Sequence, residues 1–237
     1  NDDFRLLFGQ TWDVISPLYP GVLSYSVGWD GGNIGYRRTQ LRLERYLNFS
    51  DVLKMEIQGS LNQDIIPDFP TASVDREPAD WPLLEGRLGW VLGPRGKGSR
   101  PITLGVSAHI GEVEFDFRDT SPAPLNLPPQ DDRRFRTWSF NADFRVPLTE
   151  RLGVQGEFFT GENLSSFLGG IGQGVCACNR NTIRSTGGWI DVWFDWTERF
   201  HTHAGWGIDD PVNTDFLIGR TYNQFIFLNF SYDVTKS

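Results

Sequence analysis

The sequence lacks any hydrophobic run long enough to cross a membrane as a helix, because polar or charged residues interrupt every stretch well before the roughly 18 apolar residues required. It also lacks a basic excess: 22 Lys and Arg stand against 30 Asp and Glu, which gives a formal net charge of −8. Phosphate binding needs a basic surface, so this balance argues against a nucleic-acid partner. These absences exclude a helical membrane protein and disfavour a nucleic-acid-binding protein.

Cysteine occurs only twice, at Cys176 and Cys178, in a segment rich in Gly and Asn. The C-x-C pair leaves three interpretations open: a local disulfide, a metal site completed by outside ligands, or two incidental thiols. No complementary Cys or His pair lies nearby in the sequence, and no EF-hand spacing occurs. We therefore expect neither a metal site nor a cofactor.

The chain opens without a starting Met and without the basic, apolar and small-residue regions of a signal peptide. Either a leader was removed or the chain is part of something longer. What the sequence does contain in abundance is glycine, with 26 residues, and aromatic residues, which make up 14% of the chain. At 237 residues it has the size of one large β-domain.

The clearest pattern lies in residues 36–61, which alternate between apolar and charged side chains on both sides of a polar turn predicted at residues 48–51. Successive side chains on a strand point to opposite faces, so the alternation predicts a β-hairpin with one apolar and one charged face. The pattern recurs along the chain, in residues 4–13, 81–92, 102–117, 135–146, 152–161, 187–197, 200–209 and 220–234.

These predicted strands run about 10 to 14 residues, which is long for a soluble protein but typical of a tilted membrane-spanning strand. The connections alternate between short ones and long ones, as they do between the periplasmic turns and extracellular loops of outer-membrane barrels. The prediction is an all-β fold: residues 1–237 as a single antiparallel transmembrane β-barrel domain of about ten strands, either complete or lacking N-terminal strands of a larger barrel.

Aromatic residues gather at both ends of the predicted strands. Amphipathic rings favour the membrane–water interface, so two girdles are expected around an apolar band. Those at the long-loop ends are Trp12, Tyr36, Trp81, Trp138 and Tyr222. Those at the short-turn ends are Phe49, Trp90, Phe144, Trp196, Phe200, Phe230 and Tyr232.

Four short motifs resemble those of outer-membrane porins: FGQTWD at 8–13, SPLYP at 16–20, YRRTQLRLE at 36–44 and NFSYDVT at 229–235. The closest resemblance is to the porin-like proteins of planctomycete type. It implies the C-terminal portion of a larger barrel in the bacterial outer membrane, in contact with lipid, that passes ions and small hydrophilic solutes as a homotrimer. The chain departs from many outer-membrane proteins at its end, where Thr-Lys-Ser follows the last predicted strand.

If the apolar faces meet lipid, the polar faces line a lumen, because ionisable groups face hydrocarbon only at high cost. Opposed charges across a constriction would then select solutes by charge. The basic side chains of the first strands would face Asp13 and loop 14–35 if that loop folds inward, as constriction loops do in porins. The alternative is that these charges only pair and solvate along the wall. The residues predicted to line the pore are Arg5, Asp13, Arg38, Arg42, Glu44, Lys54, Glu56, Arg87, Asp143 and Arg145.

Two other functions compete with a channel. The first is a soluble all-β module that binds a ligand or carbohydrate. The second is an outer-membrane hydrolase with His203 and Asp209 or Asp210, but the predicted register places His203 at the short-turn end, away from these carboxylates. No nucleophile motif occurs, so we predict no catalytic residue and no enzyme. The glycine-rich segment 161–174 is interpreted as a flexible external loop, because it lacks the Lys-Ser/Thr of a P-loop.

Overall fold

The computed structural model describes residues 3–65, 74–96, 98–217 and 219–235. Almost all of the regular structure is β-strand, with four short 3-10 helices: η1 (Tyr25–Gly28), η2 (Ser165–Phe167), η3 (Gly170–Gly172) and η4 (Asn213–Asp215). Among the described residues, no helix has the length and apolar character needed to cross a membrane. The strands are β1 (Phe4–Trp12), β2 (Arg37–Ser50), β3 (Leu53–Asn62), β4 (Val74–Pro78), β5 (Leu83–Leu92), β6 (Ile102–Phe117), β7 (Gln130–Pro147), β8 (Leu152–Glu162), β9 (Arg184–Asp195), β10 (Phe200–Pro211) and β11 (Asn223–Tyr232).

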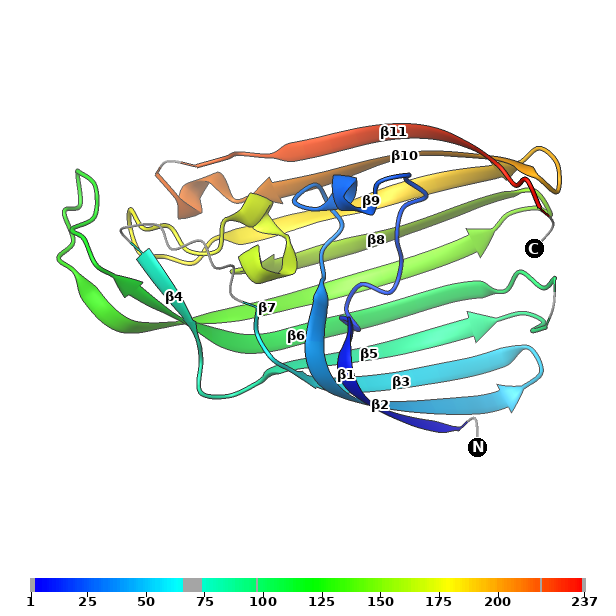
Figure 1. The fold of residues 1–237 in the computed structure, drawn as a ribbon, viewed down its shortest axis with the longest axis horizontal. Coiled ribbons are helices and arrows are strands. Elements are labelled where there is room, and N and C mark those ends of the chain that lie inside the picture. Colours follow the sequence, from blue (N-terminus) through cyan, green and yellow to red (C-terminus); the bar gives the residue numbers. More distant parts are fainter. Residues whose placement is uncertain (1–2, 66–73, 97, 218, 236–237) are drawn as a thin grey trace.

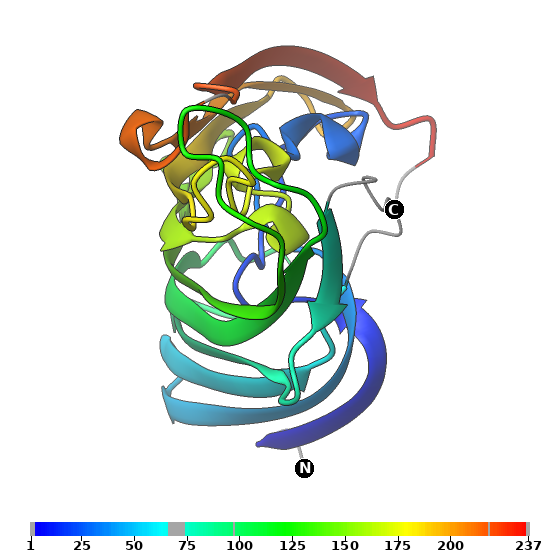
Figure 2. The ribbon, with the colours of Figure 1, turned by 90° about the vertical axis from the view of Figure 1, so that its left-hand side faces the viewer.

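The strands form one antiparallel sheet in which sequence neighbours pair, in the order β1-β2-β3-β5-β6-β7-β8-β9-β10-β11. The short strand β4 pairs with the long-loop end of β6 instead. Strands β1 and β11 end the order, and in the described part of the chain neither pairs with the other. The sheet curves strongly, and Figure 2 shows loop 13–36 and the helices η1, η2 and η3 inside the curve. We call that concave side the inner face.

Each predicted segment contains a strand, and the all-β antiparallel prediction is confirmed. Strand β4 was not predicted, because its sequence VDREP shows no apolar alternation. The predicted turn at 48–51 is wrong in detail. Strand β2 continues to Ser50, because the register shifts between Asn48 and Ser50 at an irregularity in the β2–β3 pairing. Short turns lie at one end of the sheet and longer connections at the other (Figure 1).

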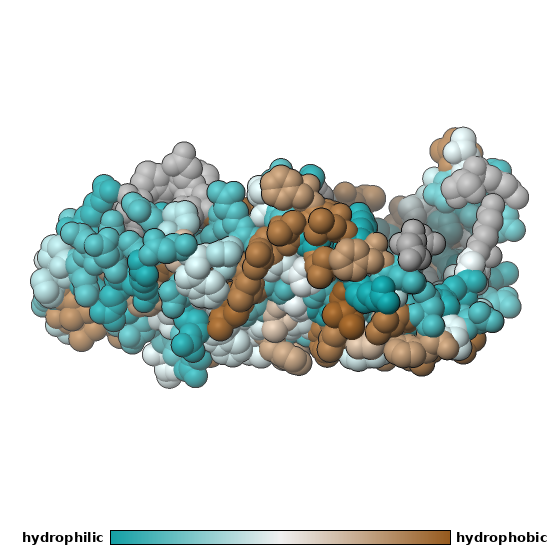
Figure 3. Space-filling model, turned by 90° about the horizontal axis from the view of Figure 1, so that it is seen from below, coloured by the Kyte–Doolittle hydropathy of each residue, from teal (hydrophilic) through white to brown (hydrophobic). Residues whose placement is uncertain are grey.

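The sheet buries its charged face and exposes its apolar face, which is the reverse of a sheet in a soluble protein. Charged side chains of the inner face are buried, with Arg38 and Asp191 both 0% exposed. Apolar side chains of the opposite, outer face are exposed, with Phe8 at 82% and Ile226 at 80%. In Figure 3, hydrophobic residues gather over the middle of the face shown, and hydrophilic residues dominate toward the end with the long loops.

The main apolar core is small and lies inside the curve rather than between two sheets. Its members come mostly from the connections that fold inward, and few come from strands. They are Val14, Ile15, Ile34, Leu83, Phe159, Leu164 and Phe167. A second cluster at the long-loop ends of β6 and β7 contains Val113, Phe115, Phe117 and Phe135. Burial of these residues fixes the inward loops, because apolar area removed from water contributes roughly 25 cal/mol per Å².

Candidate functional site

Loop 13–36 crosses the inner face and is fastened to it by carboxylates of the sheet. Near its start, the Val14 N–H donates to Glu85 on β5 over 2.8 Å. Further along, Glu157 on β8 accepts from the Ser16 hydroxyl at 2.9 Å and from the Leu18 N–H at 2.8 Å. These hydrogen bonds satisfy backbone and hydroxyl donors that are buried away from water, so they hold the loop at defined points along the wall.

The tip of the loop reaches the far side of the curved sheet. The Gly21 N–H donates to Asp191 of β9 over 3.0 Å, and Asn229 of β11 donates to the Gly21 carbonyl over 2.6 Å. Gln155 of β8 bonds both the Tyr19 carbonyl and Asp191, each at 3.0 Å. The loop thus folds inward, and it spans the interior from β5 to β11.

Arg38 is a fully buried charge of the inner face. Its Nε lies 3.2 Å from Asp13 Oδ2, its Nη1 lies 3.6 Å from Asp64 Oδ1, and its Nη2 donates to the Ser166 carbonyl over 2.5 Å. The guanidinium also lies over the Phe167 ring at 3.9 Å from its centroid. A buried arginine needs this full set of partners, because an unpaired charge away from water is very costly.

A second group of predicted pore residues meets on β1 and β2. Glu44 is buried and lies 3.6 Å from Arg5 and 3.5 Å from Arg42. It also accepts from the Tyr46 hydroxyl and from Gln58 Nε2, the latter over 3.2 Å. Arg5 is the solvent-exposed member of this group, with 60% of its side chain exposed, whereas the side chain of Arg42 is 11% exposed.

The third group lies on β3, β5 and β7. Arg87 forms a two-pronged bond with Asp143, at 3.0 Å from Nε and 2.7 Å from Nη2, and its Nη1 lies 3.9 Å from Glu56. Lys54 donates to Glu56 over 2.7 Å. The predicted residues therefore share the inner face, and nearly all of them form ion pairs along it. Arg145 differs, because its guanidinium lies over the ring of Trp193 at 4.9 Å.

Sequence reasoning missed a second segment that folds inward, residues 163–174. Interpreting it as a flexible external loop was wrong: Leu164, Phe167 and Ile171 are buried, and Phe167 stacks on His109 of β6 with ring centroids 3.9 Å apart. The Ile171 N–H donates to Asp209 on β10 over 3.1 Å. The signal that could have revealed it is the set of apolar residues spaced through the glycines.

The histidines at the start of β10 pair with carboxylates of β9. His203 Nδ1 lies 2.9 Å from Asp191 Oδ2, and His201 Nδ1 lies 2.7 Å from Asp195 Oδ1. Asp209 instead accepts from the Ser185 hydroxyl over 2.5 Å, at the other end of the strand. The separation of His203 from Asp209 agrees with the predicted register and removes the pairing on which the hydrolase interpretation rested.

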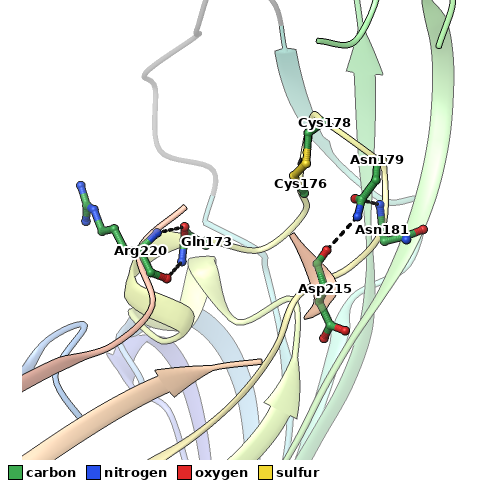
Figure 4. Close-up of a disulfide and its surroundings, with 7 residues drawn as sticks. All are labelled: Gln173, Cys176, Cys178, Asn179, Asn181, Asp215 and Arg220. Carbon is green, nitrogen blue, oxygen red and sulfur yellow. Dashed lines mark hydrogen bonds between the residues drawn. A yellow bond between two sulfur atoms is a disulfide. The ribbon is translucent and has the colours of Figure 1, made fainter. Parts of the chain in front are cut away.

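Cys176 and Cys178 form a disulfide, which decides between the three interpretations of the C-x-C pair. Both cysteines are buried with Ile183 and Phe216 in a small apolar cluster. Figure 4 shows the bond beside Asn179, whose side-chain amide donates to the Asp215 carbonyl over 3.0 Å. Within the described ranges, no three His, Cys, Asp or Glu side chains gather as a metal ion would require.

Two carboxylates on the connections between strands, Asp215 and Asp30, have shifted pKa values. Asp215 accepts from Arg184 Nε and Nη2, both at 2.8 Å, and these bonds hold the pKa of the Asp215 carboxyl below its ordinary value. Burial raises the pKa of Asp30 on loop 13–36, against the opposing effect of a backbone hydrogen bond from Gly172.

No protein-family model matches this sequence, and comparisons with curated proteins and with solved structures give no significant match. The resemblance to porins therefore rests on the four short motifs alone.

Proposed function

We propose that this chain forms the C-terminal portion of an outer-membrane β-barrel porin, in which ions and small hydrophilic solutes diffuse through a water-filled lumen. The observation that carries the proposal is the inverted polarity of the sheet. Apolar side chains such as Phe8 and Ile226 are exposed on the outer face, whereas Arg38 and Asp191 are buried on the inner face. Lipid around the outer face would surround its apolar side chains with hydrocarbon, and water in the lumen would hydrate the charged side chains of the inner face.

The outer face is too apolar and too continuous for a soluble ligand-binding module. Exposed large apolar residues occur on every long strand of the sheet, from Leu6 on β1 through Phe140 on β7 to Leu228 on β11. Soluble monomers rarely expose contiguous apolar patches of more than a few hundred Å². A hydrocarbon environment stabilises this face, and water does not.

Polar atoms on the inner face support the presence of water there. Within the described residues, Ser60 Oγ and Asn141 Oδ1 are buried and have no hydrogen-bond partner in the protein. A buried polar atom left unpaired costs roughly 1–3 kcal/mol, which a bound water avoids. A lumen that admits water supplies such partners.

Two features bear on location and assembly. Disulfides persist in exported proteins and are rare in the cytosol, so the Cys176–Cys178 bond favours an extracytoplasmic site. The edges β1 and β11 leave backbone groups unpaired within the described chain, and lipid cannot satisfy such groups. The proposed barrel is closed by further strands, and the porin resemblance adds a trimeric assembly.

The test is conductance of the purified full-length protein in planar lipid bilayers. We expect stepwise, ohmic ion currents, and we expect Glu157→Gln to increase the conductance because the anchor of Ser16 and Leu18 is weakened. The matched control is Glu150→Gln, in an exposed turn. A protein that dissolves in water without detergent and never inserts would refute the channel.

A further inference from the structure

A cavity of about 470 Å³ lies on the inner face at the short-turn end of the sheet. Side chains from five strands and the β5–β6 turn converge on it, and they include Arg100, Arg145, Trp193, His201, His203 and the carboxylate of Asp195. His203 also contacts Asp191, the anchor of the loop tip, so the cavity adjoins the point where loop 13–36 meets the wall. Its volume lies in the usual range for small-molecule sites.

Arg145 is the group in this cavity that is free to bind an anion. The other arginine, Arg100, is committed to Asp195 through a 2.6 Å ion pair. Among the described residues, no carboxylate lies within ion-pair distance of Arg145, and its guanidinium lies over the Trp193 ring. Stacking on the ring leaves the N–H groups at the edge of the guanidinium available. These groups point in parallel directions and can donate two hydrogen bonds to one carboxylate or phosphate.

Trp193 is a rigid support for this arginine. It is buried, and its ring passes over the backbone of Gly153, where an added Cβ would lie only 2.0 Å from the ring. Glycine at this position thus lets the indole sit flat against β8. A fixed aromatic surface under Arg145 limits the orientations of the guanidinium and lowers the entropy lost when it binds a ligand.

His203 adds a polar contact of a different kind. Its Nδ1 bonds Asp191, so in the neutral ring that nitrogen carries the proton and Nε2 is a hydrogen-bond acceptor. A further hydrogen-bonding nitrogen in the same cavity as Arg145 suits a solute that has hydroxyl groups as well as a negative charge. The volume of the cavity likewise exceeds what a bare inorganic ion needs.

We propose that this cavity binds small hydroxylated organic anions, with Arg145 on Trp193 holding their carboxylate or phosphate group. This site rests on the proposed channel, and it gives the opening of that channel at the short-turn end a preferred class of solute. It stands on the cavity itself, so binding to the protein in detergent tests it without any need for conduction.

The experiment is isothermal titration calorimetry of the full-length protein in detergent, with gluconate and inorganic phosphate as probes and glucose as the neutral reference. We expect saturable binding of gluconate and weaker binding of phosphate. Arg145→Gln should raise the dissociation constant of gluconate about tenfold, which corresponds to the loss of a charge-assisted bond. Arg145→Lys should give a dissociation constant between those of the parent protein and Arg145→Gln, because lysine keeps the positive charge but lacks the two-pronged guanidinium.

Arg151→Gln is the control, since Arg151 is exposed at the same end of the sheet but does not line this cavity. If Arg145→Gln and Arg151→Gln weakened gluconate binding equally, binding would depend only on the overall positive charge at this end of the sheet, and the proposed site would be overturned. Glucose binding as tight as gluconate binding would overturn the anion preference. Gluconate binding without conductance would refute the channel and retain the site, whereas conductance without binding would do the reverse.

Discussion

The inner and outer faces of this sheet are built from adjacent residues of the same strands, yet they meet opposite environments. On β2, Arg38 is buried in a network with Asp13 and Ser166, while its neighbour Arg37 is exposed on the other side of the strand. The difference teaches that burial here follows charge pairing and inward loops. Along the middle of the strands it does not follow hydrophobicity, because large apolar side chains of the outer face are exposed there, and the buried apolar clusters lie mainly where loops fold inward.

The largest effect on the contrast between the two faces is expected from removing the buried charge of Arg38. Arg38→Ala leaves Asp13 and Asp64 without their shared cation inside the protein. We expect a loss of about 3–5 kcal/mol in the free energy of unfolding, as for other broken buried pairs. Denaturant titration in detergent measures it. Arg37→Ala is the control on the same strand, and equal losses in the two variants would contradict the inward network.

A smaller effect is expected from placing a charge on the outer face. Leu88 is exposed near the middle of β5, so Leu88→Arg would face hydrocarbon in the proposed barrel. The cost at the bilayer midplane is about 2–4 kcal/mol. Folding into lipid vesicles, followed by heat-dependent mobility on gels, reports the change, with Leu88→Met as the conservative control. If Leu88→Arg folds as well as the parent protein and gains solubility without detergent, the outer face belongs in water.

The smallest effect concerns an exposed ion pair at the long-loop end of the sheet, between Arg184 at the start of β9 and Asp215 of η4. The pKa of Asp215 is held below 3.8 by the bonds from Arg184. A lowered carboxyl pKa contributes stability above the ordinary value and loses it as the pH falls through the folded value.

Arg184→Gln should therefore lower the thermal stability slightly at neutral pH, where the contribution of the pair is fully present, and the difference from the parent protein should shrink as the pH falls below 3.8. Thermal unfolding followed on both sides of that value measures it, with Arg133→Gln as the exposed control. An identical acid response in Arg184→Gln and the parent protein would show that the pair contributes nothing.

Much of the strand arrangement was accessible from the sequence because a pleated strand alternates its side chains strictly. The pairing of sequence neighbours then followed from the short turns. Strand β4 escaped prediction because VDREP lacks that alternation, and the inward course of residues 163–174 escaped because glycine is common in exposed loops as well. Assigning Arg38 and Glu44 to the charged face required only the period of two.

By itself, then, the sequence determined the two-faced strands and the side of the sheet on which each charge lies, since this depends only on the pleat. The tertiary structure decided which charges pair and which loops enter the interior. It also decided that Arg145 stacks on Trp193, whereas Arg100 forms an ion pair with Asp195. The bond from Leu18 to Glu157 joins residues 139 positions apart, so it depends on the curvature of the whole sheet. No local pattern encodes such a contact.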